Sequence, residues 1–228
     1  MLYIVSTPIG NLKDITYRAV EILKSADIIA AEDTRHTKNL LRHYGIETPL
    51  TSYFEHNEQR KTRALVAQLK EGKNVALVSD AGTPGICDPG YRLIKAANDE
   101  GVAVTVIPGA CAALAGLSLS GLPSDEFHFF GFLPVKPGQR RKKLESFRNY
   151  RGTIICYESP HRILKSLQDI KEVLNNPVVC IARELTKMFE ETLRAPACEL
   201  LAQLEQTPLK GEVVILLPAE EGRGKSCG

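Results

Sequence analysis

Short apolar runs alternate with amphipathic stretches through the first half of the chain. Runs at residues 2–6, 28–31, 75–79 and 102–107 predict strands, and a weaker run lies at 51–54. Amphipathic stretches predict helices at residues 16–25, from Thr34 as N-cap to before Gly45, and at 57–71. The alternation is typical of βαβ units, so we expect a mostly parallel sheet with helices on both faces, in which strands 75–79 and 102–107 are fully buried.

The pattern changes after an apolar run at residues 127–132. Residues 133–138 are rich in proline and glycine, and we interpret them as a domain linker. Beyond them, strands are predicted at 153–157, 178–182 and 213–217, and helices at 140–149, 161–174 and 197–206. The sequence therefore predicts an α/β protein of two domains: residues 1–132, and a smaller mixed α/β domain of residues 133–228. Residues 220–228 are expected to be a frayed tail.

Composition is that of an ordinary globular protein. The 228 residues are 43% hydrophobic and 25% charged. Residues 1–132 carry 13 Lys and Arg against 15 Asp and Glu, whereas residues 133–228 carry 16 against 12, so the second half is the basic one. The uncharged stretch 102–123 is broken by proline and glycine, which favours a buried strand, turn and helix over a membrane span.

The six cysteines show no spacing typical of a metal site. They form no C-x-x-C pair and have no histidine at zinc-ligand distance along the chain. The N-terminal apolar run is too short for a signal peptide. We therefore expect reduced thiols, no metal, no membrane association and a cytoplasmic protein.

Three glycine- and proline-rich turns follow predicted strands, at residues 7–11, 79–90 and 108–112. Open α/β sheets bind ligands at the carboxyl ends of their strands. Any one of these turns alone is more simply a tight connection, but three at one edge favour a binding site. No G-x-G-x-x-G motif follows the first strand and no P-loop motif is present, so neither a dinucleotide nor a nucleoside triphosphate is indicated.

Six ordered motifs carry a resemblance to a known family. They occupy residues 6–12 (STPIGNL), 31–37 (AEDTRHT), 79–84 (SDAGTP), 121–125 (GLPSD), 157–159 (YES) and 182–187 (ARELTK). Together they resemble the tetrapyrrole-methylase superfamily, and within it they are most similar to members that methylate a ribose in small-subunit ribosomal RNA. The resemblance runs from about residue 2 to about residue 218.

This resemblance implies a two-domain homodimer with S-adenosylmethionine bound in the cleft between the domains. It also implies 2′-O-methylation of a cytidine in the decoding region of small-subunit (16S) ribosomal RNA. The third loop departs from the family pattern at Ala110, where relatives often have proline. Family members often continue well past the last strand, and such an RNA-binding extension is not expected in residues 219–228. The positions that match cofactor contacts are Pro8, Ile9, Gly10, Asp80, Ala81, Gly82, Ile86, Cys111, Ala112, Tyr157, Glu158 and Ala182.

Methyl transfer to a ribose hydroxyl requires alignment of the reactants, and a general base helps because the hydroxyl is a weak nucleophile. Candidate bases are Glu32 and Asp33, near Arg35, and Glu184, near Lys187. The alternative is that these carboxylates form an ion-pair network with the neighbouring arginines and Lys187. Sequence reasoning leaves both open.

A basic cluster at the start of the second domain is the candidate RNA contact. It comprises Arg140, Arg141, Lys142 and Lys143, and His161 and Arg162 are further candidates. The alternative is a solvated helix face. Two other functions also stay open: methylation of a small anionic tetrapyrrole, and a non-catalytic RNA-binding factor in ribosome assembly.

Overall fold

The computed structural model describes residues 1–219. These residues fold into two compact units, of which the first is Met1–Cys111 and the second begins at Ala112. The predicted tail at 220–228 lies outside the described residues. Among the helices of the described chain, none is both long and apolar enough to cross a membrane.

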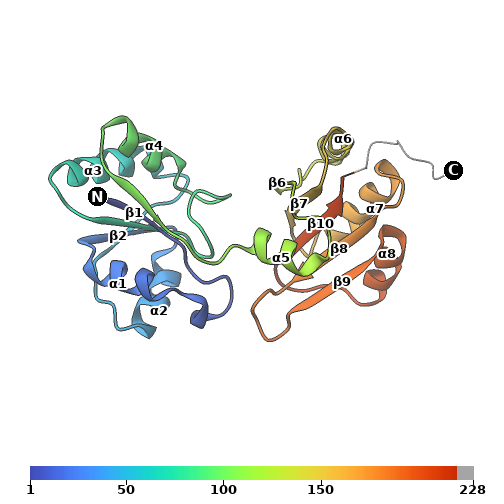
Figure 1. Ribbon diagram of the computed structural model, residues 1–228, viewed down its shortest axis with the longest axis horizontal. Helices are drawn as coiled ribbons and strands as arrows, with labels where there is room; N and C mark the ends of the chain where they lie inside the picture. The colour runs from blue at the N-terminus through green and yellow to red at the C-terminus, as the bar shows by residue number, and fades with distance from the viewer. Residues whose placement is uncertain (220–228) are drawn as a thin grey trace. The chain divides into compact units, whose positions relative to one another are not determined.

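The first unit contains a five-stranded sheet in which every strand pair is parallel. The strand order is β3-β2-β4-β1-β5. The strands are β1 (Leu2–Val5), β2 (Ile28–Ala31), β3 (Leu50–Ser52), β4 (Val75–Val78) and β5 (Val104–Ile107). The helices are α1 (Tyr17–Ser25), α2 (Thr34–His43), α3 (Glu58–Lys70) and α4 (Tyr91–Asp99), with a 3-10 turn at Leu12–Asp14 (Figure 1).

Helices cover both faces of this sheet, as predicted. Successive strand side chains point to opposite faces, so β4 sends Ala76 and Val78 into one core and Val75 and Leu77 into the other. Leu23 of α1 and Leu41 of α2 belong to the first core, and Leu65 of α3 and Leu93 of α4 to the second. Figure 1 shows α1 and α2 on one side of this sheet and α3 and α4 on the other.

The expectation of two fully buried strands is confirmed for β4 and wrong for β5. All four residues of β4 are buried, whereas Val106 of β5 is 49% exposed. The reason is position in the sheet, because β4 is central and β5 is an edge strand with a neighbour on one side only.

The second unit contains a mixed sheet of five strands, in the order β6-β7-β10-β8-β9. Strands β6 and β7 are parallel and the other pairs are antiparallel. The strands are β6 (Phe127–Phe132), β7 (Thr153–Glu158), β8 (Val178–Arg183), β9 (Glu191–Pro196) and β10 (Val213–Pro218). The helices are α5 (Ala112–Ser120), α6 (Pro137–Ser146), α7 (Ile163–Val173) and α8 (Ala197–Gln206), with a 3-10 turn at Phe147–Asn149.

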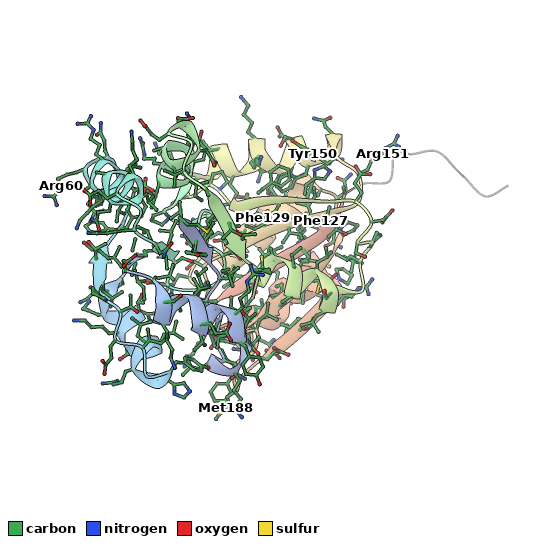
Figure 2. The ribbon with its side chains drawn as sticks, turned by 60° about the vertical axis from the view of Figure 1, so that its left-hand side comes forward. Arg60, Phe127, Phe129, Tyr150, Arg151 and Met188 are labelled. Carbon is green, nitrogen blue, oxygen red and sulfur yellow. The ribbon has the colours of Figure 1, made fainter. Side chains whose placement is uncertain are left out.

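The boundary between the units lies after Cys111 rather than after Phe132. Strand β6, which the sequence assigns to the first domain, pairs with β7 in the second sheet. Figure 2 labels Phe127 and Phe129 of this strand. Helix α5 also belongs to the second unit, because a Cβ on Gly116 would lie 3.3 Å from a Val214 methyl group of β10. The second unit is therefore about as long as the first, and not smaller. Residues 133–136 connect β6 to α6, and residues 137–138 are the first two of α6, so the stretch 133–138 is not a domain linker.

Candidate active site

The first two glycine- and proline-rich loops are bonded to each other at the carboxyl edge of the first sheet. The Thr7 N–H donates to the Gly82 carbonyl at 2.9 Å, and the Gly82 N–H donates to the Thr7 carbonyl at 3.1 Å. The Thr7 hydroxyl donates to the carbonyl oxygen of Ser79 at 3.1 Å. Loop 79–90 is thus held against loop 7–11 and does not project freely into solvent.

The third loop meets the other two through Gly109 and Ala110. A Cβ on Gly109 would lie 2.8 Å from the Cβ of Ser6, closer than real side chains pack, so only glycine fits there without movement. The carbonyl oxygen of Ala110 lies 3.5 Å from the position of a Cβ on Gly82. The structure therefore brings the three predicted loops together.

Gly82 adopts a backbone conformation that favours glycine. Its φ angle is +82°, a region that costs an L side chain about 1–2 kcal/mol. A Cβ there would meet only ordinary contacts, at 3.5 Å from Ile9 and Ala110. The requirement for glycine at this position is therefore mainly conformational, and it fixes the course of the loop.

A group of carboxylates lies beside these loops. The Asp80 carboxylate accepts a hydrogen bond from the Asp33 backbone N–H at 3.0 Å, and the Asp80 N–H donates to Glu32 at 3.4 Å. Burial raises the pKa of Glu32 above its ordinary value, and the charges of Asp88, Asp80 and Asp33 raise that pKa further. Burial also raises the pKa of Asp88, with a smaller contribution from Asp80. The fold thus gathers negative charge at the carboxyl ends of β2 and β4.

Asp33 is occupied at the start of α2. Its carboxylate accepts hydrogen bonds from the Arg35 backbone N–H at 2.8 Å and from the Arg35 guanidinium at 2.7 Å. Asp33 is therefore the N-cap of α2, in place of the predicted Thr34. The bonds from Arg35 lower the pKa of Asp33 to about 2, which makes it a weak base. Of the two adjacent candidates, Glu32 is the better proton acceptor.

The predicted cofactor-contact positions fall in both units. Of those in the first unit, Ile9 is buried, whereas Ile86 is 45% exposed within the loop that also contains Asp80. Because Ile86 is exposed in a loop that is bonded to loop 7–11, its side chain can contact an apolar ring of a bound ligand. The others in this unit are Pro8, Gly10, Ala81, Gly82 and Cys111.

In the second unit, Glu158 is a buried carboxylate with its bonds already made. It lies at the end of β7, forms an ion pair with Arg162 at 2.6 Å, and accepts hydrogen bonds from the Ser159 N–H and the Ser166 hydroxyl. Its side chain is 1% exposed. Glu158 therefore ties the end of β7 to the start of α7, and Arg162 is engaged internally.

Three other predicted positions of this unit differ in their surroundings. The ring of Tyr157 lies 4.9 Å from that of Phe129 and 5.6 Å from that of Phe132, which is itself exposed. Ala182 is fully buried within β8, and Ala112 is the first residue of α5. Of these three residues, Tyr157 is the one whose side chain packs against other aromatic rings.

Glu184 and Lys187 form a closed network at the turn after β8. The Lys187 ammonium lies 2.9 Å from both Glu184 and Glu212, and the Glu212 backbone N–H donates to Glu184 at 3.0 Å. These bonds, led by that from the Glu212 N–H, lower the pKa of Glu184. Burial opposes the charge on Lys187, but its bonds to the two glutamates outweigh burial and raise its pKa. This geometry favours the ion-pair alternative over a catalytic base.

The basic cluster of α6 divides into buried and exposed members. Arg140 is buried and donates to Asp169 at 2.7 Å, while Arg141 bridges Asp169 and Glu172. Arg140 is thus removed from the groups that a phosphate could reach. Lys143 lies over the ring of Phe130, 3.8 Å from its centroid.

Two members of the predicted RNA-contact set point outward. Lys142 and His161 are exposed, and neither side chain forms an ion pair with any other described residue. They are the members of the set that an external phosphate could reach most directly.

Sequence reasoning missed two carboxylates around the second loop. Asp88 belongs to the acidic group, and its signal was its place in the same loop as Asp80. Glu58 of α3 accepts a hydrogen bond from the Gly90 N–H at 3.1 Å and pairs with Arg92 at 3.2 Å, which anchors the far end of the loop. Nothing in the sequence pattern pairs Glu58 with this loop. Among residues 1–219, no group of three or more histidine, cysteine or acidic side chains could hold a metal ion.

Comparison with known proteins gives a consistent family. A model of the tetrapyrrole (corrin/porphyrin) methylases matches residues 1–201. The protein named ribosomal RNA small subunit methyltransferase I of Escherichia coli O157:H7 is 51% identical over 225 residues, which cover 97% of this chain and 79% of that relative. The protein of the same name from Halalkalibacterium halodurans is 50% identical, over 98% of this chain and 76% of its own length.

Solved structures show the same fold at low identity. Diphthine synthase superposes with a TM-score of 0.72 at 16% identity, over 96% of this chain and 89% of that one. Uroporphyrin-III C-methyltransferase from Thermus thermophilus, complexed with S-adenosylhomocysteine, gives 0.66 at 18% identity, over 95% and 96%. The matched family and the relatives at about half identity lead to one conclusion: this chain belongs to the tetrapyrrole methylases and, within them, to the ribosomal RNA small subunit methyltransferase I group.

Proposed function

We propose that this chain transfers a methyl group from S-adenosylmethionine to small-subunit ribosomal RNA. The observation that carries the proposal is the meeting of three glycine- and proline-rich loops at the carboxyl edge of the first sheet, beside carboxylates that include Glu32 and Asp80. The relatives' name supplies the substrate class. At 50–51% identity along nearly the whole chain, a shared substrate class is the simplest expectation.

The residues of this edge suit such a cofactor. When bound, S-adenosylmethionine supplies a methyl group on a positively charged sulfur, and it also carries an ammonium group. The carboxylates Glu32, Asp80 and Asp88 attract positive charge to this edge. Exposed Ile86 offers an apolar surface to an adenine ring, and the backbone conformation of Gly82 fixes the course of the loop that contains Ile86.

The finer proposal is 2′-O-methylation of a cytidine in the decoding region, with Glu32 as the general base. A 2′-hydroxyl must lose its proton as the new bond forms, and a base acts best with a pKa near the working pH. Glu32 has a raised pKa, whereas the bonds of Asp33 and Glu184 lower theirs. Among the candidate carboxylates, Glu32 is therefore the one whose environment favours accepting a proton.

The internal bonds of the predicted RNA-contact residues reduce the number that can reach a phosphate. Lys142 and His161 are proposed to approach phosphates directly, and Arg141 and Lys143 to add positive charge from partly engaged positions. Arg140 and Arg162 act within the fold. A second-unit surface with two such exposed groups gives a modest electrostatic contribution to RNA binding.

A homodimer and a cytoplasmic location complete the proposal. Large apolar side chains are exposed on the second unit, among them Leu114 and Leu119 of α5 and Phe132 of β6, and exposed apolar surface is typical of an interaction site. Light scattering should give about twice the 25.1 kDa of one chain. The five cysteines of the described chain are free thiols, as suits a reducing compartment.

The direct test is methyl transfer with labelled cofactor to three acceptors: unmethylated small ribosomal subunits, free small-subunit RNA and a porphyrinogen. Label in the RNA, located at a cytidine ribose by nuclease mapping, is the expected result. Label in the porphyrinogen alone would replace the proposal with tetrapyrrole methylation. Tight binding to small subunits without label in any acceptor would indicate a non-catalytic assembly factor.

A further inference from the structure

Helix α2 has a solvent face that is cationic along its whole length. It contains no Asp or Glu between Thr34 and His43. Its inner side, with Thr37, Leu40 and Leu41, is buried. The exposed residues are Arg35, His36, Lys38, Asn39, Arg42 and His43.

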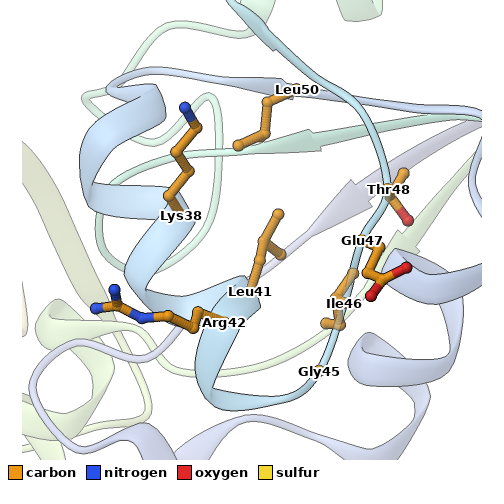
Figure 3. A pocket seen from close by; sticks show the side chains of 8 residues that line it. All are labelled: Lys38, Leu41, Arg42, Gly45, Ile46, Glu47, Thr48 and Leu50. Carbon is orange, nitrogen blue, oxygen red and sulfur yellow. The ribbon is translucent and has the colours of Figure 1, made fainter.

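A pocket of about 590 Å³ lies at the far end of this face. Lys38 and Arg42 project from α2 one helical turn apart, and Leu41, Ile46 and Leu50 give the pocket apolar walls (Figure 3). Gly45, Glu47 and Thr48 complete the lining, and Glu47 lies across the pocket from the two cations (Figure 3). Pockets for small ligands have volumes of roughly 300–1,000 Å³, so one nucleotide would fit.

Within residues 1–219, the fold pairs neither cation with a carboxylate, and with Glu47 the pocket lining keeps one net positive charge. Arg42 donates to the Asn39 side-chain oxygen at 3.1 Å, and among the described residues neither Lys38 nor Arg42 forms an ion pair. Arg35, at the opposite end of α2, is paired with Asp33. The helix dipole favours Arg42 in the last turn, but it does not account for Lys38 in the middle of the helix.

The charge near the candidate active site disfavours phosphate at that edge. The edge that contains Glu32, Asp33 and Asp80 repels the phosphates of an RNA chain. Helix α2 starts at this edge and reaches Arg42 after about 14 Å, at 1.5 Å per residue. The nearest unpaired cations along this helix are therefore those at the pocket, and they can offset the repulsion for a neighbouring part of the RNA.

We propose that the pocket of Lys38 and Arg42 binds a phosphate-bearing nucleotide of the substrate RNA that flanks the methylated nucleotide, about 14 Å along α2 from the carboxylate edge. The inference rests on the proposed function for the identity of the RNA. The base lies against Leu41, Ile46 and Leu50, and the phosphates on either side contact the two cations. This gives the first unit an RNA contact of its own, separate from the basic cluster of α6.

The test uses single-stranded oligocytidylate and the full-length protein. Fluorescence anisotropy over a series of salt concentrations gives the slope of log affinity against log salt. K38Q/R42Q should flatten the slope by about 1.4, at about 0.7 for each of two phosphates on single-stranded nucleic acid. The charge-preserving variant K38R/R42K should keep the wild-type slope.

The matched control is R60Q/R63Q on α3, which covers the other face of the same sheet. Arg60, labelled in Figure 2, and Arg63 are exposed, and their replacement removes the same charge from the same unit. The slope for this control should stay within error of wild type. If both neutral variants flattened the salt slope equally, or if K38Q/R42Q left it unchanged, the proposed pocket would be wrong. RNA binding would then reflect only non-specific electrostatic attraction.

The proposed function is tested separately in the same preparations. Affinity for S-adenosylhomocysteine, measured by calorimetry, should be unchanged in K38Q/R42Q, while methyl transfer to small subunits at low substrate concentration should fall at least several-fold. If the wild-type protein binds oligocytidylate through the pocket but methylates no RNA, the methyltransferase proposal fails and the nucleotide site stands.

Discussion

At the scale of single residues, Glu32 is a side chain whose charged form is destabilised by the fold. Its pKa is raised by burial and by neighbouring carboxylates, so the folded protein binds its proton more tightly than the unfolded chain does. Ionised Glu32 therefore reduces stability above its ordinary pKa of 4.5. We predict that E32Q raises the free energy of unfolding at pH 7, with no gain below about pH 4, and slows methyl transfer by about 100-fold or more.

The control is E184Q, for which the expected change in stability at pH 7 has the opposite sign. The Glu212 N–H and Lys187 lower the pKa of Glu184, so its ionised form stabilises the fold above its ordinary pKa, and this contribution is lost as the pH falls through the lowered value. E184Q should lower stability at pH 7 and leave the pH profile of methyl transfer unchanged. Urea unfolding at pH 4 and pH 7, with initial rates from pH 5 to 9, measures both. A stabilised E184Q, or an E32Q enzyme with full activity, would contradict this assignment.

Arg140 and Lys142 show how neighbouring residues of one charge take different roles. Removing Arg140 leaves the buried Asp169 with Arg141 as its remaining partner. R140Q should cost about 3 kcal/mol of stability, typical of a broken buried pair. K142Q should change stability by less than about 0.5 kcal/mol, as expected for an exposed side chain, and should weaken RNA binding. Thermal and urea unfolding of both variants decide this, and equal stabilities would refute the distinction.

The same pair shows what sequence can and cannot predict at this scale. The sequence predicts a basic cluster at the start of a helix, and that cluster exists. The buried member is set by Asp169 of α7, which is distant in the chain and reaches Arg140 only through helix packing. Likewise, glycine motifs predict that the three loops meet, whereas the raised pKa of Glu32 depends on charges from separate loops that no local pattern reports.

At the scale of elements, loop 79–90 depends on the backbone conformation at Gly82. Gly82 has a φ of +82°, and Gly72, just after α3, has a φ of +90° with open space around it. We predict that G82A and G72A each lose about 1–2 kcal/mol of stability, because alanine is strained in this region. Only G82A should weaken cofactor binding, since only Gly82 bonds to loop 7–11. Calorimetry with S-adenosylhomocysteine measures this, and equal affinities would argue against a cofactor role for the loop.

The sequence predicts those elements whose pattern of apolar residues agrees with the way they pack in the fold. Strands β2 and β6 and helix α8 have the predicted bounds, because their apolar pattern and their packing agree. Strand β9 was missed, since Glu191–Pro196 mixes charged and apolar residues and forms a strand through its pairing with β8 at the sheet edge. Helix α4 was also missed, because it begins directly after the glycine- and proline-rich loop that dominates the local pattern.

At the scale of the whole molecule, the position of the domain boundary shows how the sheet pairing overrides local signals. Pro137 and Gly138 suggest a linker, but Pro137 is the first residue of α6, where proline is common. Strand β6 precedes that helix and pairs in parallel with β7, and β6–α6–β7 is thus a βαβ unit inside the second sheet. A proline-rich break within such a unit is indistinguishable, from sequence alone, from a break between two domains.

This leads to a prediction about dividing the chain. Each unit has its own core: the first has apolar clusters on both faces of its sheet, and the second has the cluster under α6, α7 and α8. Fragments 1–111 and 112–228 should therefore each fold, with cooperative thermal unfolding by circular dichroism and a monomer-sized or dimer-sized elution volume. Fragment 133–228 lacks α5 and β6, which uncovers Val214 and Leu216 of β10 and exposes the edge of β7. Unpaired strand edges and bare apolar faces promote aggregation, so this fragment should be insoluble or unfold without cooperativity. If 133–228 folded as well as 112–228, the boundary after Cys111 would be wrong, and α5 and β6 would not be integral to the second unit.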